Sequence, residues 1–333
     1  NEELRMKKLL KKTLKLILPV VLGGFILFWV YRDFDFTKAG DVLLHGTNWW
    51  WMLFSLVFGV FAQVFRGWRW RQTLEPLDAF PKKSDCVNLF FFSFAASLVV
   101  PRIGEVSRCG VLAKYDNVSF AKSLGTVVTE RLVDTLTILL ITGITVLLQL
   151  PIFVTFLQQT GTKIPSLVHL LTSVWFYIIL FCFIGVAILL YYLRKTLFFY
   201  ERVKGFVLNI WEGIMSLKGV RNIPLFIFYT LAIWACYFLH FYFTFYCFAF
   251  TAHLGILAAL VMFVGGTFAV IVPTPNGAGP WHFAIISMMM LYGVNVTDAG
   301  IFALIVHGIQ TFLVVLLGIY GFAALSFTNR HRG

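Results

Sequence analysis

Long apolar stretches alternate with short polar stretches along most of this chain. A helix needs roughly 20 apolar residues to cross a hydrocarbon core. Stretches near that length cover 14–31, 49–66, 123–149, 171–193, 223–250 and 299–325. They lack the period-two alternation of apolar and polar residues that is typical of barrel strands. The pattern predicts an all-α, polytopic integral membrane protein with about six full spans, in which residues 1–333 form a single transmembrane domain.

Two further apolar stretches do not have the pattern of simple spans. The first, 88–100, is too short to cross and ends at Pro101 and Gly104, whereas the second, 254–272, is broken by the sequence PTPNGAGP. Proline stops a helix and glycine lets the chain turn. We therefore expect two re-entrant helical hairpins, each of which enters the bilayer and returns to the same side.

Lysine and arginine concentrate in cytoplasmic loops. If both hairpins are re-entrant, one side of the membrane receives all 27 of these residues except Arg32, Lys38, Lys163 and Arg131. This bias predicts a protein of the cytoplasmic membrane with both termini in the cytoplasm. Residues 14–150 and 171–325 then have opposite orientations and form the two half-repeats of an inverted repeat. In transporters of that kind, broken helices meet at a substrate site near the midplane.

Composition agrees with a membrane protein, because 59% of the residues are hydrophobic and only 13% are charged. A soluble protein of this composition would expose large apolar patches. The net charge of +12 belongs mainly to the predicted cytoplasmic loops. It fits contact with anionic headgroups and does not point to nucleic acid. The five cysteines form no CxxC pair and have no histidine at metal-ligand spacing, so we expect neither a metal site nor a cofactor.

Three charged residues, Arg102, Glu105 and Arg108, follow the first helix break. If a helix restarts there, Glu105 and Arg108 are spaced to form an i,i+3 pair. We interpret the three residues as groups at the mouth of a polar cavity. The alternative is that the arginines mark the cytoplasmic interface and Glu105 only pairs with them.

A second charged cluster, TERLVD, lies inside the predicted span 123–149. On a helix, Glu130 and Asp134 share one face, and Arg131 is rotated from it by roughly 100°. Each charge at a helix centre costs about 2.5–3.5 kcal/mol on insertion scales, so the cluster needs partners or water. Arg131 could pair with either acid or with Glu105. The two acids then leave a charge for a proton, a cation or another arginine to balance, and the cluster could serve either transport or packing.

The second break supplies a different set of candidate residues, namely Pro275, Asn276, Gly277, Gly279 and His282. No acid occurs between Glu212 and Asp298. Proton chemistry in this half of the chain would therefore fall to His282 or to His307. His282 is the stronger candidate because it lies beside the break.

The motifs PRIGEVSRCGVL, SFAKSLGTVVTERLVD and PTPNGAGP, in this order, resemble the flippase-like family. This is the transmembrane region of lysylphosphatidylglycerol synthases, which also occurs in stand-alone proteins. The resemblance implies movement of phospholipids or polyprenyl-linked lipids between leaflets. It places the site on Arg102, Gly104, Glu105, Arg108, Glu130, Arg131, Asp134, Pro275, Gly277 and Gly279.

Two departures from the family pattern narrow these expectations. Family members often carry an acid after the second glycine-rich motif, where this chain has Pro280, Trp281 and His282. The synthases also carry an aminoacyl-transfer domain, whereas eight residues follow the last predicted span here. We therefore expect no lysyl transfer to lipid by this chain.

Three functions fit these observations. The first is a lipid translocase whose partners are membrane lipids with anionic headgroups. The second is a secondary transporter for a small solute or ion with a midplane site. The third is an intramembrane lipid transferase with Glu130, Asp134 and His282 as acid–base groups, but the sequence contains no catalytic motif that supports it. We expect a transporter and not an enzyme, and an oligomer is compatible with the sequence.

Overall fold

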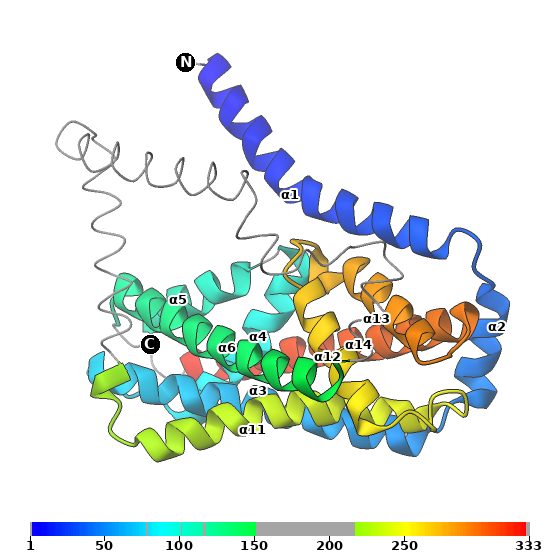
Figure 1. Ribbon diagram of the computed structural model, residues 1–333. Helices are drawn as coiled ribbons and strands as arrows, with labels where there is room; N and C mark the ends of the chain where they lie inside the picture. The colour runs from blue at the N-terminus through cyan, green and yellow to red at the C-terminus, as the bar shows by residue number, and fades with distance from the viewer. Residues whose placement is uncertain (1, 78, 101, 116–117, 151–216, 331–333) are drawn as a thin grey trace, which may run out of the picture.

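The computed structural model describes residues 2–77, 79–100, 102–115, 118–150 and 217–330 (Figure 1). The long helices are α1 (Glu2–Tyr31), α3 (Trp49–Leu74), α4 (Lys83–Val99), α5 (Ile103–Tyr115), α6 (Phe120–Leu148), α11 (Ile223–Tyr242), α12 (Ile256–Ala269), α13 (Pro280–Leu291) and α14 (Val296–Arg330). Shorter helical segments are α2 (Phe36–Asp41), η1 (Val42–Gly46), η2 (Glu75–Leu77), η3 (Leu217–Gly219), η4 (Phe243–Cys247) and η5 (Pro275–Gly277). The described residues contain no strand, and the predicted all-α membrane fold is confirmed.

Four helical segments of the described chain are long and apolar enough to cross a membrane. They are Trp49–Leu77, Phe120–Leu148, Ile223–Cys247 and Val296–Phe327, which match four predicted spans. The first of them is longer than the predicted span 49–66, because α3 continues through a run of arginines to Leu74. The predicted span 171–193 lies outside the described residues.

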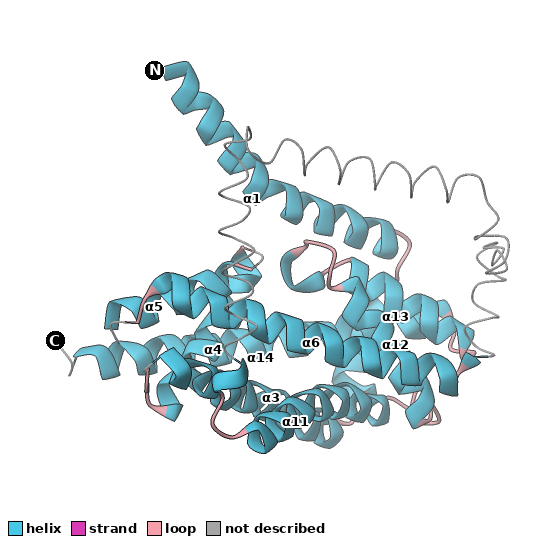
Figure 2. Ribbon diagram, turned by 60° about the vertical axis from the view of Figure 1, so that its left-hand side comes forward, coloured by secondary structure: helices cyan, strands magenta, loops and turns pink. Residues whose placement is uncertain are grey.

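The predicted span 14–31 belongs to a bent pair of helices. Ile17–Tyr31 and Phe36–Gly46 together form a further candidate span, with a bend of 97° between them. The bend follows from a polar turn after Tyr31, where the Asp35 carboxylate accepts hydrogen bonds from the amides of Thr37 and Lys38 and so starts a new helix. In Figures 1 and 2, the beginning of α1 projects from the helix bundle.

The first hairpin consists of α4 and α5, which pack against each other. Between them Arg102 adopts a positive φ of 66°. The close approach of the two helices depends on Gly104, because a Cβ there would lie 1.8 Å from the carbonyl oxygen of Ser93. The Gly104 amide donates a hydrogen bond to the Ser97 hydroxyl at 3.2 Å. The chain therefore turns back on itself at the predicted break.

The second hairpin consists of α12 and α13, joined by η5. Asn276 and Gly279 have positive φ angles of 52° and 94° in this turn. A Cβ on Gly279 would lie 2.8 Å from the Cβ of Ile26, so only glycine lets α1 pack so closely on the break. The helix α1 therefore packs over the second break and covers it.

The helices pack in pairs that connect the two halves of the chain. The helices α3 and α11 lie side by side, and the Gln63 amide donates to the Tyr237 hydroxyl at 3.1 Å between them. The hairpin helix α4 packs on α14, and the hairpin helix α12 packs on α6. Each hairpin thus contacts the long helix that follows the other hairpin. This arrangement brings the two breaks close together, because α4 also packs on η5.

Candidate functional site

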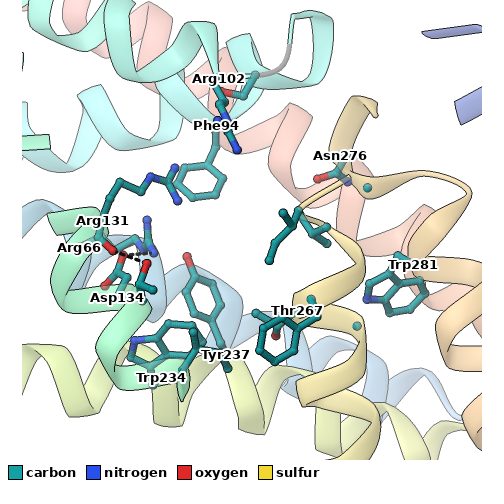
Figure 3. Close-up of a pocket in the computed structure, with 18 of the residues that line it drawn as sticks. Arg66, Phe94, Arg102, Arg131, Asp134, Trp234, Tyr237, Thr267, Asn276 and Trp281 are labelled. Atoms are coloured by element: carbon teal, nitrogen blue, oxygen red, sulfur yellow. Dashed lines mark hydrogen bonds and ion pairs between the residues drawn. The ribbon is translucent and has the colours of Figure 1, made fainter. Parts of the chain in front are cut away.

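A cavity of about 550 Å³ lies between the two breaks. Its walls come from α3, α4, α5 and α6 on one side and from α11, α12, η5, α13 and α14 on the other. Figure 3 places Arg66, Arg131 and Asp134 on one side, with Thr267 and Asn276 across from them. Ligand cavities in proteins commonly measure roughly 300–1,000 Å³, so a polar headgroup is a suitable occupant by size.

The cavity brings together eight of the residues that the sequence singles out. They are Arg102, Glu105, Arg108, Glu130, Arg131, Asp134, Asn276 and Gly277. Four others, Gly104, Pro275, Gly279 and His282, are absent from its lining. Gly104 and Gly279 instead allow neighbouring segments to pack closely at the two breaks, as described above. The sequence pattern identifies both breaks but does not separate the residues that face the cavity from those that shape it.

His282 lies behind the cavity wall. Its side chain is buried, and its Nδ1 accepts a hydrogen bond from the Gly279 amide at 3.3 Å. Its ring lies 4.5 Å from that of His307, whose Nε2 donates to the carbonyl oxygen of Asn276 at 3.1 Å. The Asn276 side chain in turn donates to the Thr311 hydroxyl at 2.7 Å. These contacts hold the second turn in shape and link it to α14.

The acids of the cavity are all paired with arginines. Asp134 accepts hydrogen bonds from Arg66 at 2.8 Å and from Arg69 at 2.7 Å. Glu130 pairs with Arg108, and its other oxygen lies 3.9 Å from Arg69. The structure thus shows that further arginines balance the acids of α6.

The restarted helix α5 pairs its charges across to α6. Glu105 pairs with Arg131, and Arg108 pairs with Glu130. The expected i,i+3 pair between Glu105 and Arg108 is therefore replaced by two contacts between helices. As the helical pattern predicts, Glu130 and Asp134 are buried on one face of α6 whereas Arg131 is exposed.

Arg66 and Arg69 are the site residues that the sequence analysis missed. A charge that follows an apolar stretch usually marks the membrane boundary, so both arginines count as loop charges in the sequence pattern. The signal that could have identified them is their i,i+3 spacing, which places both on one helix face opposite the paired acids. The Arg66 guanidinium lies over the rings of Phe94 and Tyr237, at 5.7 and 5.5 Å from their centroids.

The cavity carries a formal positive charge. Its lining holds four arginines, Arg66, Arg102, Arg108 and Arg131, and three acids, which gives a formal balance of +1. Arg69 is fully buried behind this wall and adds one more positive charge. In the described part of the chain, the Arg102 guanidinium makes no hydrogen bond or ion pair. The site therefore has the charge and the free donors to attract an anion.

Comparison with known proteins supplies the classification. Residues 16–318 match the family model described as the lysylphosphatidylglycerol synthase TM region. The chain belongs to this family. A UPF0104 membrane protein from Methanocaldococcus jannaschii is 25% identical over 228 residues, which cover 68% of this chain and 91% of that protein. No solved structure matches the chain. The protein is thus a multi-pass membrane protein of a family whose description suggests a lipid-related function.

Proposed function

We propose that this protein moves a phosphate-bearing phospholipid or polyprenyl-linked lipid between the two leaflets of the cytoplasmic membrane. The headgroup occupies the cavity between the two breaks while the acyl or prenyl chains stay in the bilayer. The observation that carries this proposal is a cavity of about 550 Å³ between the two breaks with more arginines than acids in its walls.

The arginines of the cavity suit a phosphate group. Arg102 is free of protein partners among the described residues, and Nε of Arg66 and both Nε and Nη1 of Arg108 are buried there without a hydrogen-bond acceptor. Guanidinium groups bind phosphate with two parallel hydrogen bonds. The helix α5 begins directly after Arg102, and the positive end of its dipole adds to the attraction.

The apolar part of the lining favours a lipid over a small solute. Leu139 of α6, together with Val270 and Ile271 after α12, contributes to the cavity wall. These side chains are 52%, 49% and 62% exposed. The cavity wall therefore includes exposed apolar side chains on α6 and after α12. Such side chains suit contact with acyl or prenyl chains, whereas a site for a small polar solute does not need them.

The helix contacts support two half-repeats of opposite orientation, predicted at 14–150 and 171–325. Exchange of α3 with α11, α4 with α12, α5 with α13 and α6 with α14 turns most of the contacts among these eight helices into one another. The pair α4–α14 becomes α12–α6, and the pair α5–α6 becomes α13–α14. Inverted repeats with broken helices are typical of alternating-access transporters. Together with the lysine and arginine bias, this arrangement supports re-entrant hairpins and cytoplasmic termini.

The contacts of the candidate acid–base groups favour transport over a transferase. Glu130 and Asp134 are held by arginines, and His282 accepts a backbone hydrogen bond behind the cavity wall. A general acid or base must reach a substrate proton. A carboxylate with two arginine partners is better suited to fix the helices around the site.

Lipid retention tests the proposal. We expect wild-type protein purified in mild detergent to retain anionic phospholipid, measured by native mass spectrometry. Arg102→Ala removes most of the bound lipid. Arg102→Lys keeps the charge but loses the planar guanidinium that can form two parallel hydrogen bonds, so it retains part of the lipid. Arg32→Ala is the matched control, because Arg32 pairs with Asp33 in an exposed turn away from the cavity.

Two results would contradict the proposal. One is wild-type lipid content in both Arg102→Ala and Arg108→Ala. The other is uptake of soluble glycerol phosphate by proteoliposomes that show no lipid exchange, which favours the solute transporter.

A further inference from the structure

The two walls of the cavity differ in charge. The acids and arginines of the lining all come from the first half of the chain, on α3, α5, α6 and the first break. We call this charged side the arginine wall. The opposite side, which α11, α12, η5, α13 and α14 supply, contains no lysine, arginine, aspartate or glutamate among its described lining residues, and we call it the neutral wall. Its polar side chains include Tyr237, Thr267, Asn276 and Gln310. Figure 3 shows Thr267 and Asn276 facing the charged side chains across the cavity.

The cavity has no counter-charge for an ammonium group. Its three carboxylates already pair with arginines, and the neutral wall adds none. A headgroup with its own positive charge would therefore add to an existing surplus and find no carboxylate free to pair with it.

The neutral wall has hydrogen-bond donors without acceptors. The Trp234 side chain is 9% exposed, and its indole Nε1 has no hydrogen-bond partner within the described structure. Nε2 of Gln310 is buried and lacks a partner in the same part of the chain. Both residues line the cavity. Buried donors are normally satisfied, so these groups point to a ligand with acceptor oxygens.

We infer that the neutral wall is a second subsite, which recognises the group esterified to the lipid phosphate. It takes an uncharged, hydroxyl-bearing group such as glycerol or a sugar, and it rejects ethanolamine, choline or an aminoacyl ester. The arginine wall holds the phosphate, and Gln310 donates to a hydroxyl oxygen of the attached group. This inference rests on the proposed function, because it takes the cavity as the headgroup site.

Competition between lipids with matched chains tests this subsite. Purified protein is mixed with equal amounts of phosphatidylglycerol, phosphatidate and phosphatidylethanolamine, and bound lipid is counted by native mass spectrometry. We expect phosphatidylglycerol to bind best and phosphatidylethanolamine least. Gln310→Met removes one neutral hydrogen bond, so phosphatidylglycerol binding falls roughly two- to tenfold while phosphatidate binding stays unchanged.

A charge-adding variant provides the converse test. Gln310→Glu places a carboxylate on the neutral wall, and we expect it to raise phosphatidylethanolamine binding relative to phosphatidylglycerol. Gln149→Glu adds the same charge at the end of α6, outside the cavity lining, and leaves the ratio unchanged. Equal binding of the glycerol and ethanolamine lipids to wild type, or equal effects of the two glutamate variants, overturns the second subsite.

A separate measurement of leaflet exchange distinguishes the two proposals. Headgroup preference without any lipid exchange refutes the translocase and leaves the subsite intact. Exchange at equal rates for glycerol and ethanolamine lipids, with equal binding, refutes the subsite alone.

Discussion

Replacement of Arg69 with methionine is expected to destabilise this protein far more than replacement of Arg102 with alanine. Arg69 is fully buried and donates to Asp134 at 2.7 Å and to Thr230 at 3.3 Å. Removal of one partner from a buried ion pair costs about 3–5 kcal/mol, because the remaining charge stays buried. Asp134 keeps Arg66 as a second partner at 2.8 Å, so we expect a loss near the lower end, about 3 kcal/mol.

Arg102 provides the contrast, because it is exposed to the cavity and makes no ion pair in the described structure. Its replacement should change stability by less than about 0.5 kcal/mol. The assay is reversible unfolding in mixed micelles by titration with a denaturing detergent, followed by tryptophan fluorescence. Delipidated protein in lipid-free mixed micelles keeps bound lipid from changing the comparison.

A double-mutant cycle identifies the source of the Arg69 effect. Arg69→Met combined with Asp134→Asn should cost less than the sum of the single variants, by about 0.5–3 kcal/mol, because both remove the same contact. Strict additivity, or an Arg69→Met variant within about 0.5 kcal/mol of wild type, would refute the view that this arginine is a structural counter-charge.

Three further predictions address the hairpins and the cavity. Glu105→Gln frees its partner arginine, so it should increase retained anionic lipid while it slows leaflet exchange; a parallel rise or fall of both contradicts this role. Gly104→Ala should prevent correct folding, because its Cβ would overlap a carbonyl oxygen of α4, and the monodisperse peak in size-exclusion chromatography should be lost. The control Gly110→Ala, with open space around the new Cβ, should fold normally. Single cysteines at Tyr115 and Val296, in a background without native cysteines, should react with an impermeant reagent only from the cytoplasm and only from outside, respectively; labelling on one common side excludes the proposed topology.

The sequence predicts the helices and breaks well because their causes are local. Apolar length defines the spans, and the turns at Gly104 and at PTPNGAGP need residues that tolerate close approach or a positive φ. The helical spacing of Glu130 and Asp134 likewise places both on one buried face. These features need only the residues near them in the chain.

The partners of the charges depend on distant parts of the chain, so sequence spacing did not reveal them. Arg69 remains inside the protein because Asp134, which is 65 residues further along, accepts its hydrogen bond. Hydropathy alone treats Arg66 and Arg69 as the end of a span, since it cannot include that pairing. The position of His282 behind the wall has the same origin, because α1 and α14 cover the second turn.

Leaflet exchange in proteoliposomes tests the central claim most directly. Fluorescent phosphatidylglycerol is placed in both leaflets, and an impermeant quencher reports the fraction that reaches the outer leaflet over time. The account predicts that wild-type protein exposes the inner pool faster than protein-free liposomes do, and that Arg102→Ala at equal protein content slows this step. Exchange by wild type at the protein-free rate, in vesicles where the protein is folded and correctly inserted, would contradict the account.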